Sequence, residues 1–523
     1  MIYAETSKRM LKYQKAKAKL IEYNIAQENY PAFPLNSSEL SYPTIYALSK
    51  YAEAVIDSND IEMEEYEQML SVVSQYFDAS FNVKDRSTHD LDFLLSAAVA
   101  YFLSDDFGSA KVMCAESLRF QQNDVLTPQL LLQEILRFLL LNHKWIPSDD
   151  GSTYDNIQES FLTYYMSGGN EAQLLAHLAS YQKSIYDSDN YLQIYYVDLL
   201  YAVVIRSIAK SSWKLLPEYS NMDISKWTPY LSDSSSIKML WPSQQLVGKM
   251  GILQGKSAIV QLPTGVGKTK GIELIIRSAY LSERAHVSII IAPLRALCNE
   301  IASDMQLAFE GFEINQFSDV LEEDFILDFE SSSPKILICT PEKLSYIIHH
   351  QRDFLGMLDL FIFDEGHMFD DGSRGAAYEL LIASIKDAIT DNQQIVLLSA
   401  VLSNSLEIKN WLLGEDGVLA SDAKIRTTPK SIGFASAAKD IHFYSDNPRE
   451  EDFFVPRCIE PVELEKRTGE RITRIFPDLS KSNDIAIYYA TKLCPKRRRT
   501  NDEGNRFMSK GMFYRNTNSV GET

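Results

Sequence analysis

Cysteine is scarce in this 523-residue sequence, and its few copies stand far apart. The five are Cys114, Cys298, Cys339, Cys458 and Cys494. No two of them show the short spacing of a zinc site, and nothing suggests a disulfide framework. We therefore expect reduced thiols, as in a cytoplasmic protein.

Positive charge is in deficit. The sequence has 51 Lys and Arg against 71 Asp and Glu, which gives a net charge of −20. A protein that coats nucleic acid through bulk charge needs the opposite balance. Any contact with nucleic acid must therefore come from a few locally placed basic residues, or from a part outside this sequence.

Long apolar runs are also lacking. The N-terminus is basic and polar, so it does not read as a secretory signal. The most apolar segment, Tyr195 to Ile208, contains Asp198 and Arg206 and is expected to be too short to cross a bilayer. With 45% hydrophobic and 23% charged residues, the composition predicts a soluble globular protein without membrane contact.

The first 233 residues have the periodicity of helices. Apolar residues recur three and four positions apart in eight or nine segments, separated by short polar breaks. Examples are Leu91–Phe102, Gly108–Phe120, Pro128–Asn142 and Leu192–Lys210. Residues 97–118 resemble one hairpin of a tetratricopeptide array, but no second copy follows at the same period. We predict an all-helical N-terminal domain over residues 1–233.

From residue 234 the pattern changes to apolar runs that alternate with helical stretches. The runs are Ala258–Leu262, Val287–Ala292, Lys335–Cys339, Leu358–Phe363 and Ile395–Leu398. This alternation is typical of a parallel α/β sheet, in which ligands bind at the carboxyl ends of the strands. We predict such a domain over residues 234–425.

A phosphate-binding loop follows the first of these runs. Backbone N–H groups can approach a phosphate closely where glycines stand, and a helix N-terminus, a lysine and a hydroxyl complete the site. Gly265, Gly267, Lys268 and Thr269 supply these groups in order. Leu262 stands where the strict pattern has glycine. The whole predicted loop is Pro263, Thr264, Gly265, Val266, Gly267, Lys268 and Thr269.

Polar motifs follow the other runs in a fixed order. They are Pro293-Leu294-Arg295, Thr340-Pro341, Asp364-Glu365-Gly366-His367 and Ser399-Ala400-Val401. Taken alone, the acid pair could be a solvated turn, Thr340-Pro341 a simple turn, Arg295 a solvated helix start and His367 a buried structural histidine. Because all four motifs follow the phosphate loop in a fixed order, we favour functional roles for them over these structural alternatives.

In that order the motifs resemble those of superfamily-two DExH-box helicases of the superkiller-like branch. Further matches are RGAAYE at 374–379, the stretch 398–414, and Trp241-Pro242-Ser243-Gln244-Gln245 upstream of the phosphate loop. The resemblance implies a RecA-like ATPase lobe that uses ATP and Mg²⁺, and therefore an ATP hydrolase.

The resemblance also implies roles for single residues. Around the nucleotide, Lys268 would hold the β and γ phosphates, Thr269 and Asp364 would hold Mg²⁺, Glu365 would activate the attacking water, and Gln244, or alternatively Gln245, would read adenine. Arg295, Thr340 and Pro341 would contact a nucleic-acid backbone. His367, Ser399 and Ala400 would couple the nucleotide site to a second lobe, although Val401 replaces the threonine usual in this motif.

The remaining residues, 426–523, are expected to form a linker and the truncated start of a second RecA-like lobe. Residues 484–493 would be its first helix, and the stretch from Pro495 through Arg499 would begin a disordered tail. We expect the chain to be the front part of a longer helicase, cut or frame-shifted near Cys494.

Two functions are consistent with these features. The first is an ATP-dependent nucleic-acid helicase or translocase acting on DNA or RNA. The second is a nucleotide-gated interaction subunit of a defence or repair complex, which binds ATP and nucleic acid without unwinding. A long helical N-terminal domain ahead of such a motor also resembles bacterial antiphage helicases of the Hachiman kind. By that resemblance, a nuclease is a candidate partner.

Overall fold

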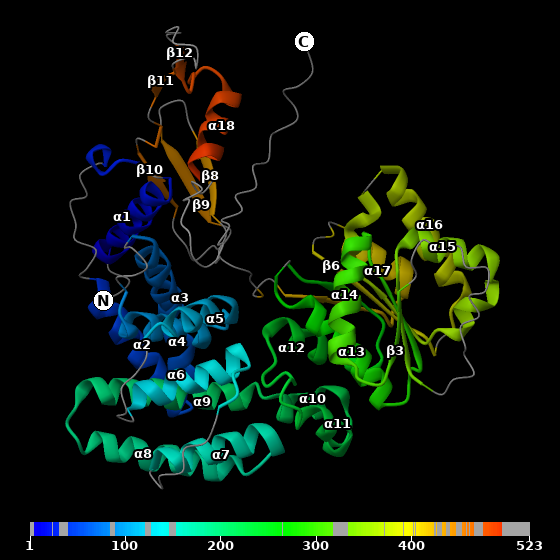
Figure 1. Cartoon of the computed structure of the whole chain (residues 1–523), viewed down its shortest axis with the longest axis horizontal. Coiled ribbons are helices and arrows are strands. Elements are labelled where there is room, and N and C mark those ends of the chain that lie inside the picture. The colour runs from blue at the N-terminus through cyan, green and yellow to red at the C-terminus, as the bar shows by residue number, and fades with distance from the viewer. Residues whose placement is uncertain are drawn as a thin grey trace. The chain divides into compact units, whose positions relative to one another are not determined.

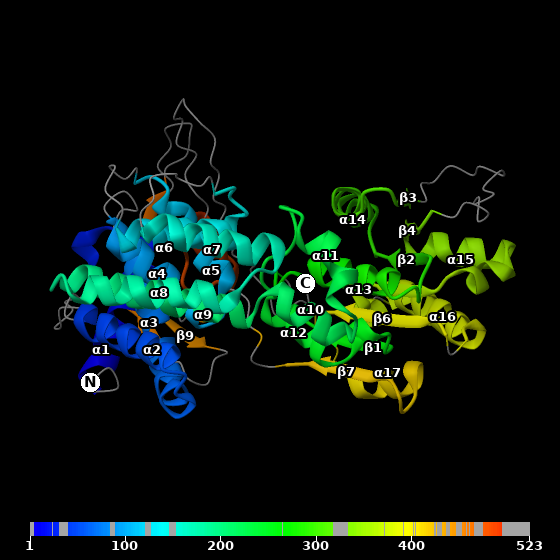
Figure 2. The same ribbon diagram turned by 90° about the horizontal axis from the view of Figure 1, so that it is seen from below.

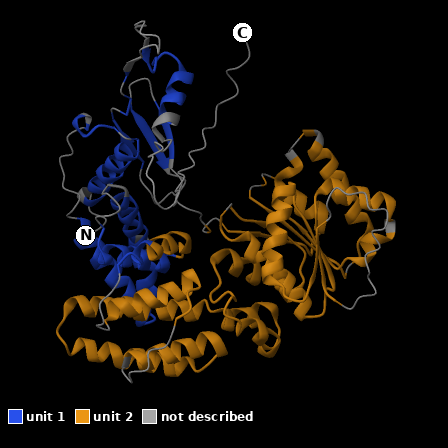
Figure 3. Cartoon of the chain, in the orientation of Figure 1, with its two compact units in different colours: residues 1–104, 116–121, 429–523 blue, residues 105–115, 122–428 orange. Residues whose placement is uncertain are grey.

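The structure is a computed structural model in which two compact units are distinguished (Figure 3). It describes residues 5–23, 25–30, 40–83, 89–120, 127–145, 153–263, 265–316, 333–370, 372–390, 392–400, 402, 404–422, 425, 431–435, 440–445, 452–456, 458–459, 461–464 and 474–493. Unit 1 comprises residues 1–104, 116–121 and 429–523, and unit 2 comprises residues 105–115 and 122–428. The predicted boundaries near 233 and 425 stay predictions.

The N-terminal region is helical, as predicted. Its elements are α1 (Glu5–Glu22), the 3₁₀ turn η1 (Gln27–Asn29), α2 (Ser41–Ile56), α3 (Asp60–Val83), α4 (Leu91–Leu103), α5 (Phe107–Ser117), α6 (Pro128–Leu141), α7 (Thr153–Ser167), α8 (Glu171–Tyr186), α9 (Tyr191–Ala209), α10 (Ser212–Ser220) and α11 (Ile224–Leu231). Local chemistry sets several ends. Thr127 caps α6 by accepting a hydrogen bond from the N–H of Leu130, and Pro128 occupies the first turn, where its missing N–H costs nothing. Asn142 ends this helix in the left-handed conformation.

Helix α9 is the most apolar of the long helices. It has 19 residues and by length and composition alone could cross a membrane, which the sequence reading did not expect. Half of that span is buried within the protein, where α9 packs against α6 and α8 (Figure 1). Its Asp198 accepts hydrogen bonds from Gln182 and Tyr186 of α8. These contacts are those of a core helix in a folded domain.

The second half of unit 2 is built on the predicted parallel sheet. Its strands are β1 (Ala258–Gln261), β2 (Val287–Ile291), β3 (Glu313–Gln316), β4 (Lys335–Cys339), β5 (Leu360–Phe363), β6 (Gln394–Ser399) and β7 (Val418–Ser421). All neighbours are parallel, and the order is β3-β4-β2-β5-β6-β1-β7. The sequence reading missed β3 and β7, which are the two edge strands, short and only partly buried.

Helices cover both faces of this sheet (Figures 1 and 2). The elements are α12 (Pro242–Lys249), η4 (Ile252–Gln254), α13 (Lys268–Leu281), α14 (Arg295–Ala308), α15 (Pro341–His350), η5 (Arg352–Met357), η6 (Gly366–Asp370), α16 (Gly372–Ala388) and α17 (Ser405–Leu413). Alternate strand residues divide between two cores: Val260 and Ile290 pack with α13 and α14, whereas Ile259 and Ile289 pack with α15, α16 and α17. Burial on both faces explains the near-continuous apolar runs.

The C-terminal residues join the N-terminal helices in unit 1. Strands β8 (Ser431–Ala435), β9 (Ile441–Ser445) and β10 (Phe453–Val455) form an antiparallel sheet, β11 (Val462–Leu464) pairs with β12 (Arg474–Phe476), and α18 (Ser482–Leu493) follows. The helix predicted at 484–493 is therefore present. Leu20 of α1 and Tyr23, directly after that helix, share a core with Phe443, Val455 and Tyr489. The predicted tail from Pro495 lies outside the described residues.

Candidate nucleotide-binding site

The phosphate loop links β1 to α13. Gly265 and Gly267 adopt φ values of +87° and +85°, a left-handed conformation that residues with a side chain rarely take. A Cβ atom on Gly265 would meet no atom within 4 Å, and one on Gly267 would meet only the Gln244 amide nitrogen at 3.5 Å. Open space therefore lies beside the loop, at the N-terminus of α13, where backbone N–H groups favour an anion.

Strand β5 is followed by Asp364-Glu365-Gly366-His367, which we call the DEGH turn. The N–H of Asp364 donates to the carbonyl oxygen of Ile291 at 2.9 Å, which continues the sheet pairing by one residue. The N–H of Glu365 donates to Oδ1 of Asp364, also at 2.9 Å. Glu365 itself has a φ of +54°, an uncommon conformation for a residue other than glycine. The turn thus places two adjacent carboxylates directly after the strand.

Gly366 is required at its position by packing. A Cβ atom there would lie 2.2 Å from Cδ2 of Leu397, a fully buried side chain of β6. No real Cβ contact is that short, so any side chain would displace either the turn or the core.

The phosphate loop and the DEGH turn meet. The Nζ atom of Lys268 lies 3.4 Å from both carboxylate oxygens of Glu365, and the Lys268 side chain is only 10% exposed. Nδ1 of His367 lies 3.3 Å from Oε2 of the same carboxylate. The sheet order explains this contact, because β5 and β1 flank β6 and their carboxyl ends lie at one edge.

Asp364 lies in an electrostatically unfavourable position. Burial raises the pKa of its carboxyl group above the usual value, and the neighbouring charge of Glu365 raises it further. Lys268, the N–H of Glu365 and His367 oppose this shift. A carboxylate that is costly to ionise in the empty site would be relieved by a bound cation.

Helix α12 supports the loop from the other side. Ser243 donates a hydrogen bond from Oγ to the carbonyl oxygen of Val266 at 2.6 Å. Sequence reasoning did not single out Ser243, although its place one residue before Gln244 was a usable signal. Gln244 is buried and its Oε1 accepts from the N–H of Trp241, while Gln245 donates to the carbonyl oxygen of Leu240.

The predicted nucleic-acid residues lie after neighbouring strands. Arg295 is exposed at the start of α14, after β2, and Thr340 precedes α15, after β4, with Pro341 in its first turn. The structure places them outside the cluster formed by Lys268 and Glu365. Both segments follow strands that pair directly, so they share one edge of the sheet.

The segment after β6 is tied to β1. The carbonyl oxygen of Ser399 accepts from the N–H of Leu262 at 2.8 Å, and that of Leu402 accepts from the Gln261 amide at 2.8 Å. The Ser399 hydroxyl is buried without a hydrogen-bond partner among the described residues. Ala400 is the first residue after this strand. Thr264 and Val401 lie outside the described residues.

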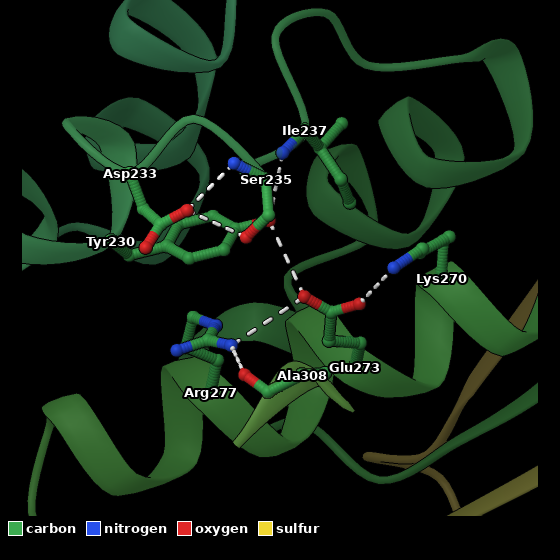
Figure 4. A network of polar contacts seen from close by, with 8 residues as sticks. All are labelled: Tyr230, Asp233, Ser235, Ile237, Lys270, Glu273, Arg277 and Ala308. Carbon is green, nitrogen blue, oxygen red and sulfur yellow. Dashed lines mark hydrogen bonds and ion pairs between the residues drawn. The ribbon is translucent and has the colours of Figure 1, made fainter. Parts of the chain in front are cut away.

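A buried polar network fixes α13 behind the phosphate loop (Figure 4). Glu273, which is 3% exposed, contacts Lys270 at 2.7 Å and Arg277 at 3.5 Å, and accepts from the Tyr230 hydroxyl at 3.4 Å. The guanidinium of Arg277 lies 4.1 Å from the ring centre of Tyr230 and 4.5 Å from that of Phe309, and it donates to the carbonyl oxygen of Ala308. The network therefore joins α11, α13 and the end of α14.

Comparisons with known proteins identify a matching family and relatives. Residues 241–408 match the DEAD/DEAH box helicase family. The Hachiman protein HamB of Bacillus cereus is 24% identical over 94% of this chain and 46% of its own length. The ATP-dependent DNA helicase Hel308 of Methanococcus vannielii is 32% identical over 35% of this chain and 24% of its own length. The chain thus spans less than half the length of these relatives.

Two solved structures match part of this chain at low identity and low TM-score. A DEAD box protein from Methanococcus jannaschii is 17% identical, with a TM-score of 0.30, over 38% of this chain and 53% of its own. The DUF1998 helicase MrfA bound to DNA and AMPPNP is 20% identical, with a TM-score of 0.29, over 36% and 27%. The family match covers every described motif from Gln244 to Ala400. Residues 241–408 of this chain are therefore a DEAD/DEAH box helicase domain.

Proposed function

We propose that this chain carries the ATP-hydrolysing lobe of a nucleic-acid helicase or translocase. The observation that carries the proposal is the 3.4 Å contact between Lys268 and Glu365. It brings the phosphate loop and the DEGH turn to one point, beside the open space at Gly265. A triphosphate placed there would replace the carboxylate of Glu365 as the partner of Lys268.

The residues present fit a magnesium ion. Thr269 stands in the first turn of α13, next to Lys268, and Asp364 carries a partly buried carboxylate. A hydroxyl and a carboxylate are oxygen donors of the kind that magnesium takes in phosphate sites. Bound there, the ion would neutralise charge developing on the terminal phosphates.

Each side chain of the site would then have a separate role in binding or hydrolysis. Lys268 would hold the terminal phosphates, and Glu365, freed from Lys268, would orient the attacking water and accept its proton. Nδ1 of His367 lies 3.3 Å from the Glu365 carboxylate, so His367 would respond when that carboxylate changes its partner. Gln244 lies beside Gly267 and is the candidate adenine reader.

Contact with nucleic acid would come from Arg295, Thr340 and Pro341. One exposed arginine, a hydroxyl and backbone N–H groups suit phosphate contacts that do not read sequence. They also fit the net charge of −20, since binding would depend on a few placed groups. Membership of a longer, two-lobed motor and a nuclease partner remain predictions, and reading the gene beyond Thr523 tests the first.

Substitutions at the two ends of the ion pair test the proposal. Lys268→Ala should abolish nucleotide binding, measured by titration with a fluorescent ATP analogue. Glu365→Gln should keep binding within about threefold and lower the hydrolysis rate by about 10² or more, because it removes the base but keeps the shape. Wild-type hydrolysis by Glu365→Gln would overturn the assignment.

A second assay separates the two candidate functions. A labelled single strand is titrated with and without the ATP analogue, and duplex unwinding is then measured with ATP. Unwinding supports the helicase. Nucleotide-dependent strand binding without unwinding supports a nucleotide-gated interaction subunit instead.

A further inference from the structure

Arg374, at the start of α16, bridges two loops that follow different strands. Its Nε donates to Oε1 of Glu342 at 2.6 Å, and its Nη2 donates to the carbonyl oxygen of Pro293 at 2.5 Å. Glu342 stands on α15, after β4, and Pro293 precedes α14, after β2. One planar guanidinium with fixed donor directions therefore sets the spacing between the two loops.

Both acceptors adjoin the residues expected to contact nucleic acid. Pro293 is two positions before Arg295, and Glu342 is two positions after Thr340. Partial burial would raise the pKa of Glu342, but hydrogen bonds from Arg374, from its own N–H and from Thr340 hold it below the usual value. Glu342 therefore stays ionised at neutral pH and keeps a charged partner for Arg374 two residues after Thr340.

The same helix start rests on the DEGH turn. A Cβ atom on Gly375 would lie 2.5 Å from the carbonyl oxygen of Phe369 and 2.9 Å from that of Met368. Both residues belong to η6, which begins directly after Glu365. One turn further along α16, the ring of Tyr378 contacts that of Phe369, with ring centres 5.2 Å apart. Such close packing does not let α16 and η6 move independently.

We propose that Arg374 is a positioning residue that couples strand binding to nucleotide binding. It holds the segments 293–295 and 340–342 at a fixed distance from the DEGH turn, so that strand and nucleotide stabilise the same arrangement. Arg374 acts through these segments and contacts neither ligand. This inference rests on the proposed function and adds to it the residue through which the two sites communicate.

The test measures reciprocal binding with the full chain and needs no hydrolysis. The probes are a fluorescent non-hydrolysable ATP analogue and labelled oligo-dT or oligo-U. In the wild type each ligand should tighten the other by one common factor, as linkage requires. Arg374→Ala should weaken strand binding about 5- to 20-fold and bring the coupling factor close to 1. Arg374→Lys keeps the positive charge but loses the planar pair of donors that contacts Glu342 and Pro293, so it should restore only part of the coupling.

Two further variants separate positioning from charge. Lys386→Ala removes one positive charge from the far end of the same helix, where Lys386 lies over the Trp411 ring, and should change neither affinity nor coupling. Glu342→Ala removes the acceptor of the same bridge but, unlike Arg374→Ala, takes away a negative charge. Simple electrostatics predicts tighter strand binding for this variant, whereas the positioning role predicts weaker coupling, as in Arg374→Ala.

The outcomes are distinct from those that test the proposed function. Wild-type coupling in Arg374→Ala, or tighter strand binding with unchanged coupling in Glu342→Ala, would overturn the positioning role. Binding of both ligands by the wild type without any coupling would overturn it too, and would leave the proposed function standing. A wild type that binds no strand refutes the proposed function itself. Thermal melting of each variant identifies any loss that comes from unfolding.

Discussion

Asp364 lies where its negative charge lowers the stability of the fold. Burial and the adjacent Glu365 both raise its pKa, so its ionised form costs free energy in the empty site. Asp364→Asn should therefore raise the free energy of unfolding at pH 7 by about 1 kcal/mol, while it removes magnesium-dependent hydrolysis. Denaturant unfolding without nucleotide measures the first effect.

The pH dependence of this gain has a definite sign. A carboxyl whose pKa is raised on folding contributes stability below its unfolded value of 3.8 and loses it as the pH rises through the folded value. The advantage of Asp364→Asn should thus shrink as the pH falls from 7 towards 4. As a control, Asp359 accepts from the N–H groups of His286 and Val287, so Asp359→Ala should destabilise instead.

Gly366 and Leu397 should behave as a coupled pair. Gly366→Ala places a methyl group on the Leu397 side chain and should cost about 1–3 kcal/mol. Leu397→Ala alone leaves a cavity in the core under α16 and should also destabilise. If the clash is the cause, the double variant should be more stable than the sum of the two losses predicts, which chemical denaturation measures. Additive losses would contradict the packing explanation.

At the scale of the element, α13 depends on the network behind it. Lys270 and Arg277 both pair with Glu273, but the side chain of Lys270 is 54% exposed and that of Arg277 only 16%. Arg277→Ala should cost about 2 kcal/mol or more, since it leaves a buried carboxylate poorly paired and removes two ring contacts.

Lys270→Ala is the matched control for Arg277→Ala. It removes a positive charge from the same carboxylate and the same helix, but an exposed ion pair contributes less than about 1 kcal/mol. Thermal unfolding of the two variants should therefore differ clearly. Equal losses would show that burial does not decide the strength of these pairs.

The elements around the nucleotide could be predicted because their signals are local. Glycines before a lysine, apolar runs and acids at a strand end each occupy a few consecutive residues. Glu273 gave no such signal, because a polar residue on a helix is taken as solvated until its partner is known. Ser243 and Arg374 lie in motifs that the sequence does show, but their hydrogen-bond partners could not be predicted from those motifs. The edge strands β3 and β7 were missed for a related reason: an edge strand of four residues, such as EINQ, buries too little to look like a strand.

At the scale of the whole molecule, unit 1 depends on contacts between the two ends of the chain. Leu20 of α1 is fully buried in the core that α1 shares with β9, β10 and α18. Leu20→Ala should cost about 2–5 kcal/mol in that unit. Amide hydrogen exchange should then speed up in β9 while β1 and β6, in unit 2, keep their protection. Equal acceleration in both units would contradict a loss that is confined to unit 1.

The order of synthesis gives this pairing a further consequence. A ribosome releases α1 more than 400 residues before Ile441 and Phe443, so at typical elongation rates the helix waits for roughly 20 to 80 s. All of unit 2 is made in that interval and can complete its parallel sheet. The nascent chain would thus hold an apolar helix face uncovered after the parallel sheet of unit 2 is complete, and such a face suits a chaperone until translation supplies β9 and β10.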